Sequence, residues 1–64
     1  MKLVEIAAIS GLIAINPENV LFVDVDKHDP KITRIILAPA VEIKTTESIT
    51  TVIAAINYGR RDRT

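Results

Sequence analysis

The chain has 64 residues, no cysteine, a formal net charge of zero and an apolar fraction of 48%. A chain this short forms one domain, and it buries only about 60% of the surface that its unfolded form exposes. The missing cysteines exclude disulfides and thiolate metal sites as supports, and the zero net charge argues against a general binder of nucleic acids or membrane surfaces.

Residues 2–9 alternate apolar and β-branched positions, which predicts a strand. A hairpin around Ser10 and Gly11 is predicted to lead into a second extended segment over 12–15. The segment 16–19 (NPEN) is expected to be a turn, because proline fixes φ and asparagine tolerates tight local conformations.

Three more strands are predicted in the middle of the chain, over residues 20–26, 31–37 and 41–44. The polar stretch 27–30 and the Ala-Pro-Ala stretch 38–40 are expected to be the turns between them.

The strand over 20–26 has the clearest pattern. Its alternation predicts two faces, with Leu21, Val23 and Val25 on one and Val20, Phe22, Asp24 and Asp26 on the other. Phe22 thus shares a face with acidic residues, which makes it a candidate anchor for a partner. Alternatively, both faces of the sheet are partly covered, one by a helix and one by a partner subunit.

From Ser48 onward the apolar period changes from two to about 3.6, as expected for an amphipathic helix. The predicted buried stripe consists of Ile49, Val52, Ile53 and Ile56. Ser48 suits the N-cap position and Gly59 the helix stop, so a helix over about 48–58 is predicted. Two or three turns of helix are not stable alone, so this helix must pack on one face of the sheet.

Together these elements predict an α+β fold: a small, mainly antiparallel sheet of three to five strands with one C-terminal helix packed on a face. Residues 1–59 form the expected domain, with a formal charge of −2, and residues 60–64, with a charge of +2, form a basic, flexible tail. Eleven isoleucines are more branched side chains than one small monomer can hide. Since leftover apolar patches normally become interfaces, we expect a homo-oligomer.

Asp24, Asp26 and His28 are candidates for a divalent metal site, because alternation places the two carboxylates on one strand face and the turn follows directly. The spacing matches no specific metal loop, and it lacks the glycine and distal glutamate of an EF-hand. A strand end entering an Asx-type turn explains these residues better, so no metal ligand is predicted.

No catalytic residue or cofactor is predicted either. His28 is the single histidine, the two glycines make no phosphate-binding loop, and no nucleophile stands beside a base and an orienting group. Arg60, Arg61 and Arg63 could contact phosphates, and they are candidate partner-binding residues together with Phe22.

No apolar run approaches the roughly 18 residues that cross a bilayer, and Glu5 interrupts the apolar start that a signal peptide would need. We therefore expect no membrane partner and an intracellular location, cytoplasmic or virion-associated.

The order of LIAINPENV (12–20), two strands, VEIK (41–44) and ESITTVI (47–53) resembles the small FlbD-like flagellar proteins of bacteria and similar short phage proteins. It also resembles the β-hairpin and terminal helix of LytTR-type DNA-binding domains. The resemblance spans residues 12–57. This chain departs from the family at Ala38-Pro39, where an Asn-Gly turn is common, and in the longer turn at 27–30.

The resemblance implies a non-enzymatic accessory or regulatory protein of a bacterium or phage. The function expected from all these features is an interaction or assembly module, homo-oligomeric, that acts on a larger protein machine. The alternative is a nucleic-acid-binding regulator that uses the C-terminal arginine cluster.

Overall fold

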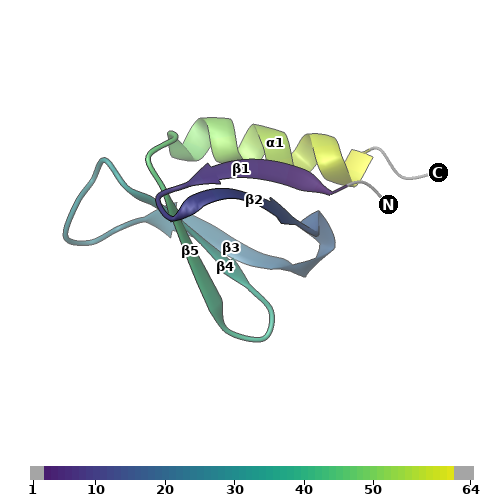
Figure 1. The fold of residues 1–64 in the computed structure, drawn as a ribbon, viewed down its shortest axis with the longest axis horizontal. Helices are drawn as coiled ribbons and strands as arrows, with labels where there is room; N and C mark the ends of the chain where they lie inside the picture. Colours follow the sequence, from purple (N-terminus) through teal and green to yellow (C-terminus); the bar gives the residue numbers. More distant parts are fainter. Residues whose placement is uncertain (1–2, 62–64) are drawn as a thin grey trace.

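The structure is a computed structural model that describes residues 3–61, with the backbone alone for Arg61. Its elements are β1 (Val4–Ala8), β2 (Gly11–Ile15), the 3-10 helix η1 (Pro17–Asn19), β3 (Val20–Val25), β4 (Thr33–Leu37), β5 (Val41–Thr45) and α1 (Ile49–Arg61). The strands form one sheet in the order β2-β1-β5-β4-β3, with every pairing antiparallel. The predicted α+β fold, with one C-terminal helix on the sheet, is confirmed (Figure 1).

The hairpin of β1 and β2 turns through two residues, since Ala8 pairs with Gly11. Gly11 has a φ of +131°, a conformation that side-chain-bearing residues rarely adopt, which explains the glycine. Ile9 lies in this turn rather than in the strand, and its backbone N–H donates to the carbonyl of Lys44 at 2.8 Å.

The predicted turn at 16–19 takes the form of a single 3-10 turn. The Asn16 side chain caps it by accepting a hydrogen bond from the Glu18 N–H at 2.9 Å, and Pro17 is buried at the first helical position. Proline suits this position because its fixed φ matches the turn and its missing N–H has no partner there anyway.

A β-bulge interrupts β3. Val20 pairs with Leu37 and Phe22 pairs with Ile36, so Leu21 is an extra residue with no partner of its own on β4. The bulge changes the predicted faces: Val20 joins Val23 against the core, while Leu21 becomes 58% exposed. The prediction that Leu21 and Val23 share a face was therefore wrong.

Two buried threonines bond β4 and β5 to β1 and to the segment that leads into α1. Thr33 and Thr45 are opposite each other on β4 and β5. The Thr33 hydroxyl donates to the carbonyl of Glu47 at 2.7 Å, and the Thr45 hydroxyl donates to the carbonyl of Ala7 at 2.9 Å. Thr45 also accepts from the Glu47 N–H at 3.2 Å. These bonds satisfy polar groups that burial would otherwise leave unpaired.

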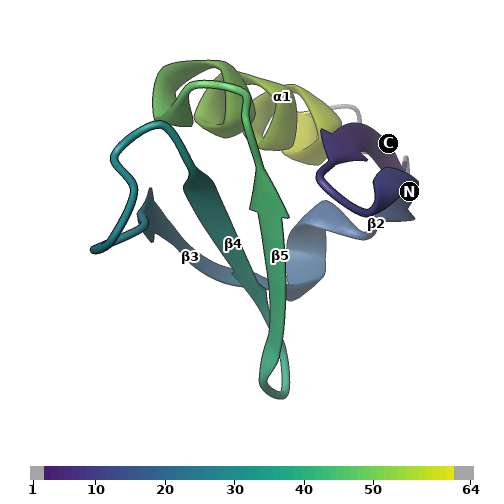
Figure 2. The same ribbon diagram turned by 60° about the vertical axis from the view of Figure 1, so that its left-hand side comes forward.

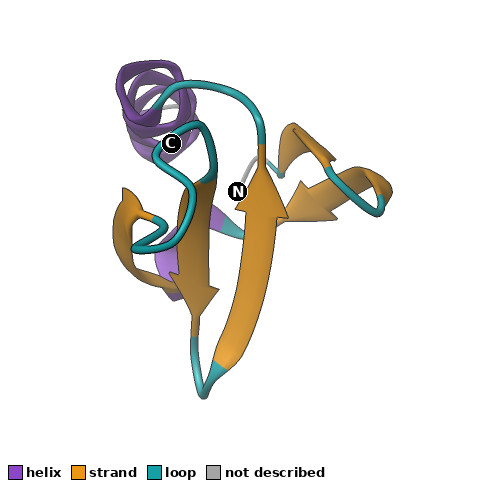
Figure 3. Ribbon diagram, turned by 90° about the vertical axis from the view of Figure 1, so that its left-hand side faces the viewer, coloured by secondary structure: helices purple, strands orange, loops and turns teal. Residues whose placement is uncertain are grey.

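The sheet consists of two parts that meet at one corner. β1 pairs with β5 only at Ala8 and Thr45 within the described residues, next to the bond from Ile9 to Lys44. Figure 3 shows the hairpin of β1 and β2 turned away from the other strands. The helix α1 contacts both parts, through β1 and through β3, and lies along one side of the sheet (Figures 1 and 2).

Ser48 caps α1 as predicted, because its hydroxyl oxygen accepts from the Thr51 N–H at 3.2 Å. The predicted helix end was wrong: α1 continues past Gly59 to Arg61. Gly59 is buried, and a β-carbon there would collide with a γ-methyl of Val4 and lie 3.1 Å from Cγ of Pro17. The glycine therefore permits close packing of α1 on β1 and η1 rather than ending the helix.

The buried face of α1 also differs from the predicted stripe. Val52 and Ile56 are buried, at 0% and 4% exposure, and Ala55 packs beside them, whereas Ile53 is 42% exposed. The helix is rotated toward its small residues, Ala55 and Gly59, because they let α1 approach the sheet closely. The core comprises Val4, Ile6, Ile15, Ile35, Val52 and Ile56.

Candidate functional site

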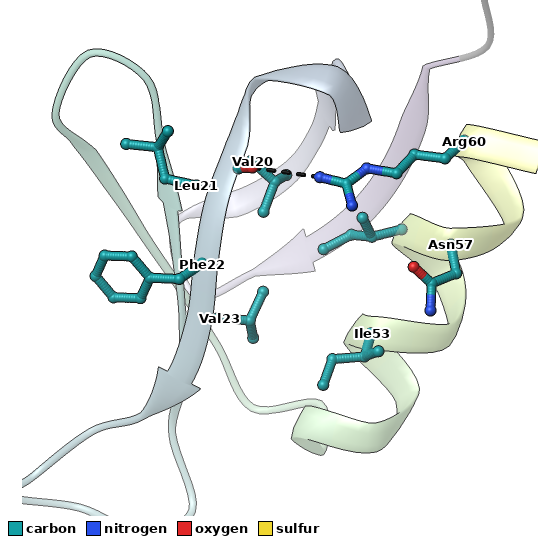
Figure 4. A pocket seen from close by; sticks show the side chains of 8 residues that line it. Val20, Leu21, Phe22, Val23, Ile53, Asn57 and Arg60 are labelled. Atoms are coloured by element: carbon teal, nitrogen blue, oxygen red, sulfur yellow. Dashed lines mark hydrogen bonds between the residues drawn. The ribbon is translucent and has the colours of Figure 1, made fainter.

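A shallow groove separates the edge of the sheet from the helix, and we call it the β3–α1 groove. The residues that line it are Val20, Leu21, Phe22, Val23, Ile53, Ile56, Asn57 and Arg60. Figure 4 shows Val20 and Val23 pointing from β3 toward the helix, where Ile53 and Asn57 face them. Leu21 and Phe22 point to the other side of the strand and form the outer rim.

The bulge produces this apolar rim. In a regular strand Leu21 and Phe22 would point to opposite faces, but the extra residue lets both side chains emerge on the side away from the helix (Figure 4). They are 58% and 49% exposed. Bulges are frequent at sheet edges and beside functional sites, where they redirect side chains.

The backbone of β3 is open along the groove, since β3 is an outermost strand of the sheet. The Asp26 N–H donates to the carbonyl of Ile32 at 2.9 Å, which places that pair in hydrogen-bonded register. Hydrogen-bonded and non-hydrogen-bonded positions alternate in an antiparallel ladder, so the backbone groups of Val23 and Val25 are directed at the open edge. An edge of this kind can pair with another strand.

Arg60 closes one end of the groove. Its Nε donates to the carbonyl of Pro17 at 3.1 Å and its Nη2 to the carbonyl of Val20 at 3.3 Å. The predicted tail began at Arg60, but this residue is helical and its guanidinium is held against η1 and the start of β3. These two bonds use the Nε hydrogen and one Nη2 hydrogen of the guanidinium, which leaves both Nη1 hydrogens and the second Nη2 hydrogen for another acceptor.

A second apolar surface lies on the hairpin of β1 and β2, on the side that does not face the core. We call it the hairpin face, and its exposed residues are Leu3, Glu5, Ala7, Leu12 and Ala14. Leu12, at 71%, is the most exposed large hydrophobic residue among those described. Among the described residues of this face, Glu5 is the one that is charged.

The outer face of β3, β4 and β5 has a different character, because ion pairs cover it. Arg34 donates to both carboxylate oxygens of Asp24, at 2.7 and 2.6 Å, and to Glu42 at 3.0 Å. The hydrogen bonds from Arg34 hold the pKa of Asp24 below its usual value, and the two carboxylates raise the pKa of Arg34. The part of this face around Arg34 is thus polar, whereas Leu21 and Phe22, on the same side of β3, are apolar and exposed.

Asp26 forms the Asx-type turn that the sequence predicted. One carboxylate oxygen accepts from the backbone N–H groups of His28 at 2.7 Å and Asp29 at 3.2 Å, and the other lies 3.2 Å from Nζ of Lys44. The His28 bond, followed by Lys44, lowers the pKa of Asp26. Asp24 and Asp26 do share a face, but each already has cationic and N–H partners. No metal-binding group was found among residues 3–61.

These ion pairs predict a specific acid sensitivity. Asp24 and Asp26 have pKa values below those of the unfolded chain, so their stabilising effect is fully present above the ordinary aspartate value of about 3.9 and is lost as the pH falls through the folded-state values. We expect the melting temperature to drop below about pH 4, measured by circular dichroism. Asp24→Asn should lose less stability over this range than the wild type, and equal losses would contradict the assignment.

Of the predicted partner-binding residues, Phe22 and Arg60 both line the β3–α1 groove. The side chain of Arg61 and all of Arg63 lie outside the described part. Sequence reasoning missed Leu21, Ile53 and Asn57 as lining residues. Leu21 was hidden by the bulge, which no glycine marks, and Ile53 by the assumption that every large apolar side chain of the helix is buried.

Within the described residues, no helix has both the length and the apolar character needed to span a membrane. Comparisons with protein-family models, with curated proteins and with solved structures found no match to this chain.

Proposed function

We propose that the protein is a non-enzymatic interaction module that self-associates and acts as an accessory or regulatory protein on a larger bacterial or phage machine, in the cytoplasm or in a virion. The observation that supports it is the exposure of large apolar side chains on two separate surfaces: Leu3 and Leu12 on the hairpin face, and Leu21, Phe22 and Ile53 at the β3–α1 groove. Contiguous apolar patches on small proteins mark interaction sites.

Self-association uses the hairpin face. Two copies can pack these faces together as in sheet-on-sheet packing, which removes Leu3 and Leu12 from water. The outer face of β3, β4 and β5 is unsuited to this role, because its ion pairs would lose solvation in a contact. Glu5, the second residue of β1, lies opposite Ala14, so the two copies must pack with an offset that keeps the Glu5 carboxylates at the rim of the contact.

Sedimentation at micromolar concentration tests self-association. The wild type is expected to sediment as a dimer or larger species, and Leu12→Lys as a 7.0 kDa monomer, because a charge introduced into an apolar contact is costly to bury. Leu21→Lys is the matched control, since it places the same charge at a similarly exposed leucine on the other surface, and it should keep the wild-type mass.

A wild-type monomer with a concentration-independent melting temperature would refute self-association. Dissociation by Leu21→Lys alone would move the contact to the β3–α1 groove. The accessory role implied by the FlbD-like resemblance needs a second, different surface for the larger machine, and the β3–α1 groove meets that need.

A further inference from the structure

The β3–α1 groove combines three features: an apolar floor, an open strand edge and a cationic end. Its floor is apolar, formed by Val20, Val23 and Ile56, and its strand edge carries unpaired backbone groups. Among the described residues that line it, Arg60 is the one charged side chain, and it stands at one end. Because the groove is apolar along its floor and positively charged at one end, it selects its occupant by charge as well as by shape.

We propose that the groove binds an extended apolar segment of a partner protein, which pairs with β3 as an added antiparallel strand and ends in a carboxylate held by Arg60. The inference rests on the proposed function, because it states what the interaction module recognises at this surface. The carboxylate belongs either to an acidic side chain or to the chain end of the partner, and both present the same two oxygens.

The strand pairing follows from the open edge. Val23 and Val25 direct N–H and C=O groups at the open edge of β3, beside the groove, so an extended segment can bond to them as in other complexes that extend a sheet. Alternate side chains of that segment would then enter the groove between Val23 and Ile53, and the others would lie over Phe22. This alternation requires small or branched apolar residues at the inward positions.

Charge fixes the direction of the segment. Arg60 is bonded to the carbonyl of Val20, so it lies at the start of β3, whereas Asp24 and Asp26 lie toward the end of that strand. A segment whose carboxylate meets Arg60 keeps its negative charge away from both aspartates. Its last residue lies at the first residue of β3, which is the antiparallel arrangement.

Arg60 is prepared for this contact. A guanidinium has five N–H donors, and the bonds to Pro17 and Val20 use two of them. They also hold the side chain in place before the ligand arrives, which reduces the conformational entropy lost on binding. The remaining donors suit the two oxygens of a carboxylate, and Asn57 is a second polar side chain that lines the groove.

Peptide binding to the full chain tests the proposal. The probes are three N-acetylated hexapeptides of alternating threonine and valine: one with a free C-terminal carboxylate, one with a C-terminal amide, and one amidated with aspartate as its last residue. Binding is followed by two-dimensional ¹H–¹⁵N NMR. We expect both carboxylate peptides to bind about tenfold more tightly than the neutral amide, and the amide signals of Val23 and Val25 to shift. If one of the two is clearly tighter, it identifies the source of the carboxylate.

Variants separate the charge from the strand pairing. Arg60→Gln should abolish the preference for carboxylate while the neutral peptide binds as before, which also shows that the variant is folded. Val25→Pro removes an N–H directed at the edge and should weaken all three peptides alike. Leu12→Lys, on the hairpin face, should change none of these affinities. Should Arg60→Gln unfold the protein, loss of the carboxylate preference at high salt provides the same evidence.

Three results of the peptide experiment would overturn the proposal: no binding of any peptide at millimolar concentration, equal affinity for the charged and neutral peptides, or shifts confined to the hairpin face. Dissociation of the oligomer by Leu21→Lys would also overturn it, because the groove would then hold a second copy. If the protein does not self-associate but still binds the peptides, the proposed oligomer is refuted and the proposed groove ligand is not.

Discussion

Replacing Ile56 with alanine is expected to lower the free energy of unfolding by about 2–5 kcal/mol. Ile56 is 4% exposed and belongs to the core cluster under α1, so the substitution removes buried methyl and methylene groups and leaves a cavity beneath the helix. A domain of this length has a total stability of about 3–10 kcal/mol, and the loss is therefore a large share of it. Urea unfolding measures the effect.

Ile53→Ala is the matched control, because it makes the same chemical change three residues earlier on the same helix. Ile53 is 42% exposed, so its truncation forfeits less buried surface, and the expected loss is below about 1 kcal/mol. Equal losses at the two positions would show that the rotation of α1 described above is wrong. A larger loss of stability for Ile53→Ala than for Ile56→Ala would support the buried helix face that the sequence predicted.

Replacing Gly59 with alanine is expected to destabilise the protein, although alanine is the better helix former by about 1 kcal/mol. The added β-carbon collides with Val4 and lies 3.1 Å from Cγ of Pro17. Neither neighbour yields easily, since valine is stiff at χ1 and proline is a ring. Overpacking costs about 1–3 kcal/mol, which exceeds the gain in helix propensity. Gly59→Val should be worse still and is expected to unfold the domain at physiological temperature.

Ala54→Gly gives the comparison for helix propensity alone, because Ala54 is exposed on the same helix. Its expected loss is about 1 kcal/mol, or a fall in melting temperature of about 4–8 °C for a domain of this size. The chain should thus prefer alanine at position 54 and glycine at position 59. A rise in melting temperature for Gly59→Ala would mean that α1 does not approach β1 and η1 as closely as described.

Most of the fold follows from local signals in the sequence. The sequence places Thr33, Ile35 and Leu37 on one face of β4, and in the structure that face is the one that packs against the core. Asn16, Ser48 and Asp26 likewise act through hydrogen bonds to backbone groups two or three residues away, so their roles can be predicted without knowing the tertiary structure.

The candidate site depends on features that are not local. The bulge at Leu21 is a choice of register between β3 and β4, and nothing in the sequence around Leu21 marks it. Which side of α1 faces the sheet depends on Gly59 and Ala55. These residues lie on the packed side, because small side chains let the helix approach Val4 and Pro17. The sequence prediction considered large apolar side chains alone and not the close approach that small residues permit, so it predicted wrongly that Ile53 is buried. Arg60 was assigned to a tail because Gly59 is a common helix stop.

The strand order also determines how the chain can assemble. Three of the four strand pairings join strands that follow one another in sequence, and the pairing of Ala8 with Thr45 is the exception. Bringing two distant parts of a chain together costs loop-closure entropy. Among the strand pairings of this sheet, that cost arises once, where β1 meets β5 and the Thr45 hydroxyl also donates to the carbonyl of Ala7. The short hairpins can form first and bring that corner together afterwards, so within the sheet one strand pairing alone must close a long loop.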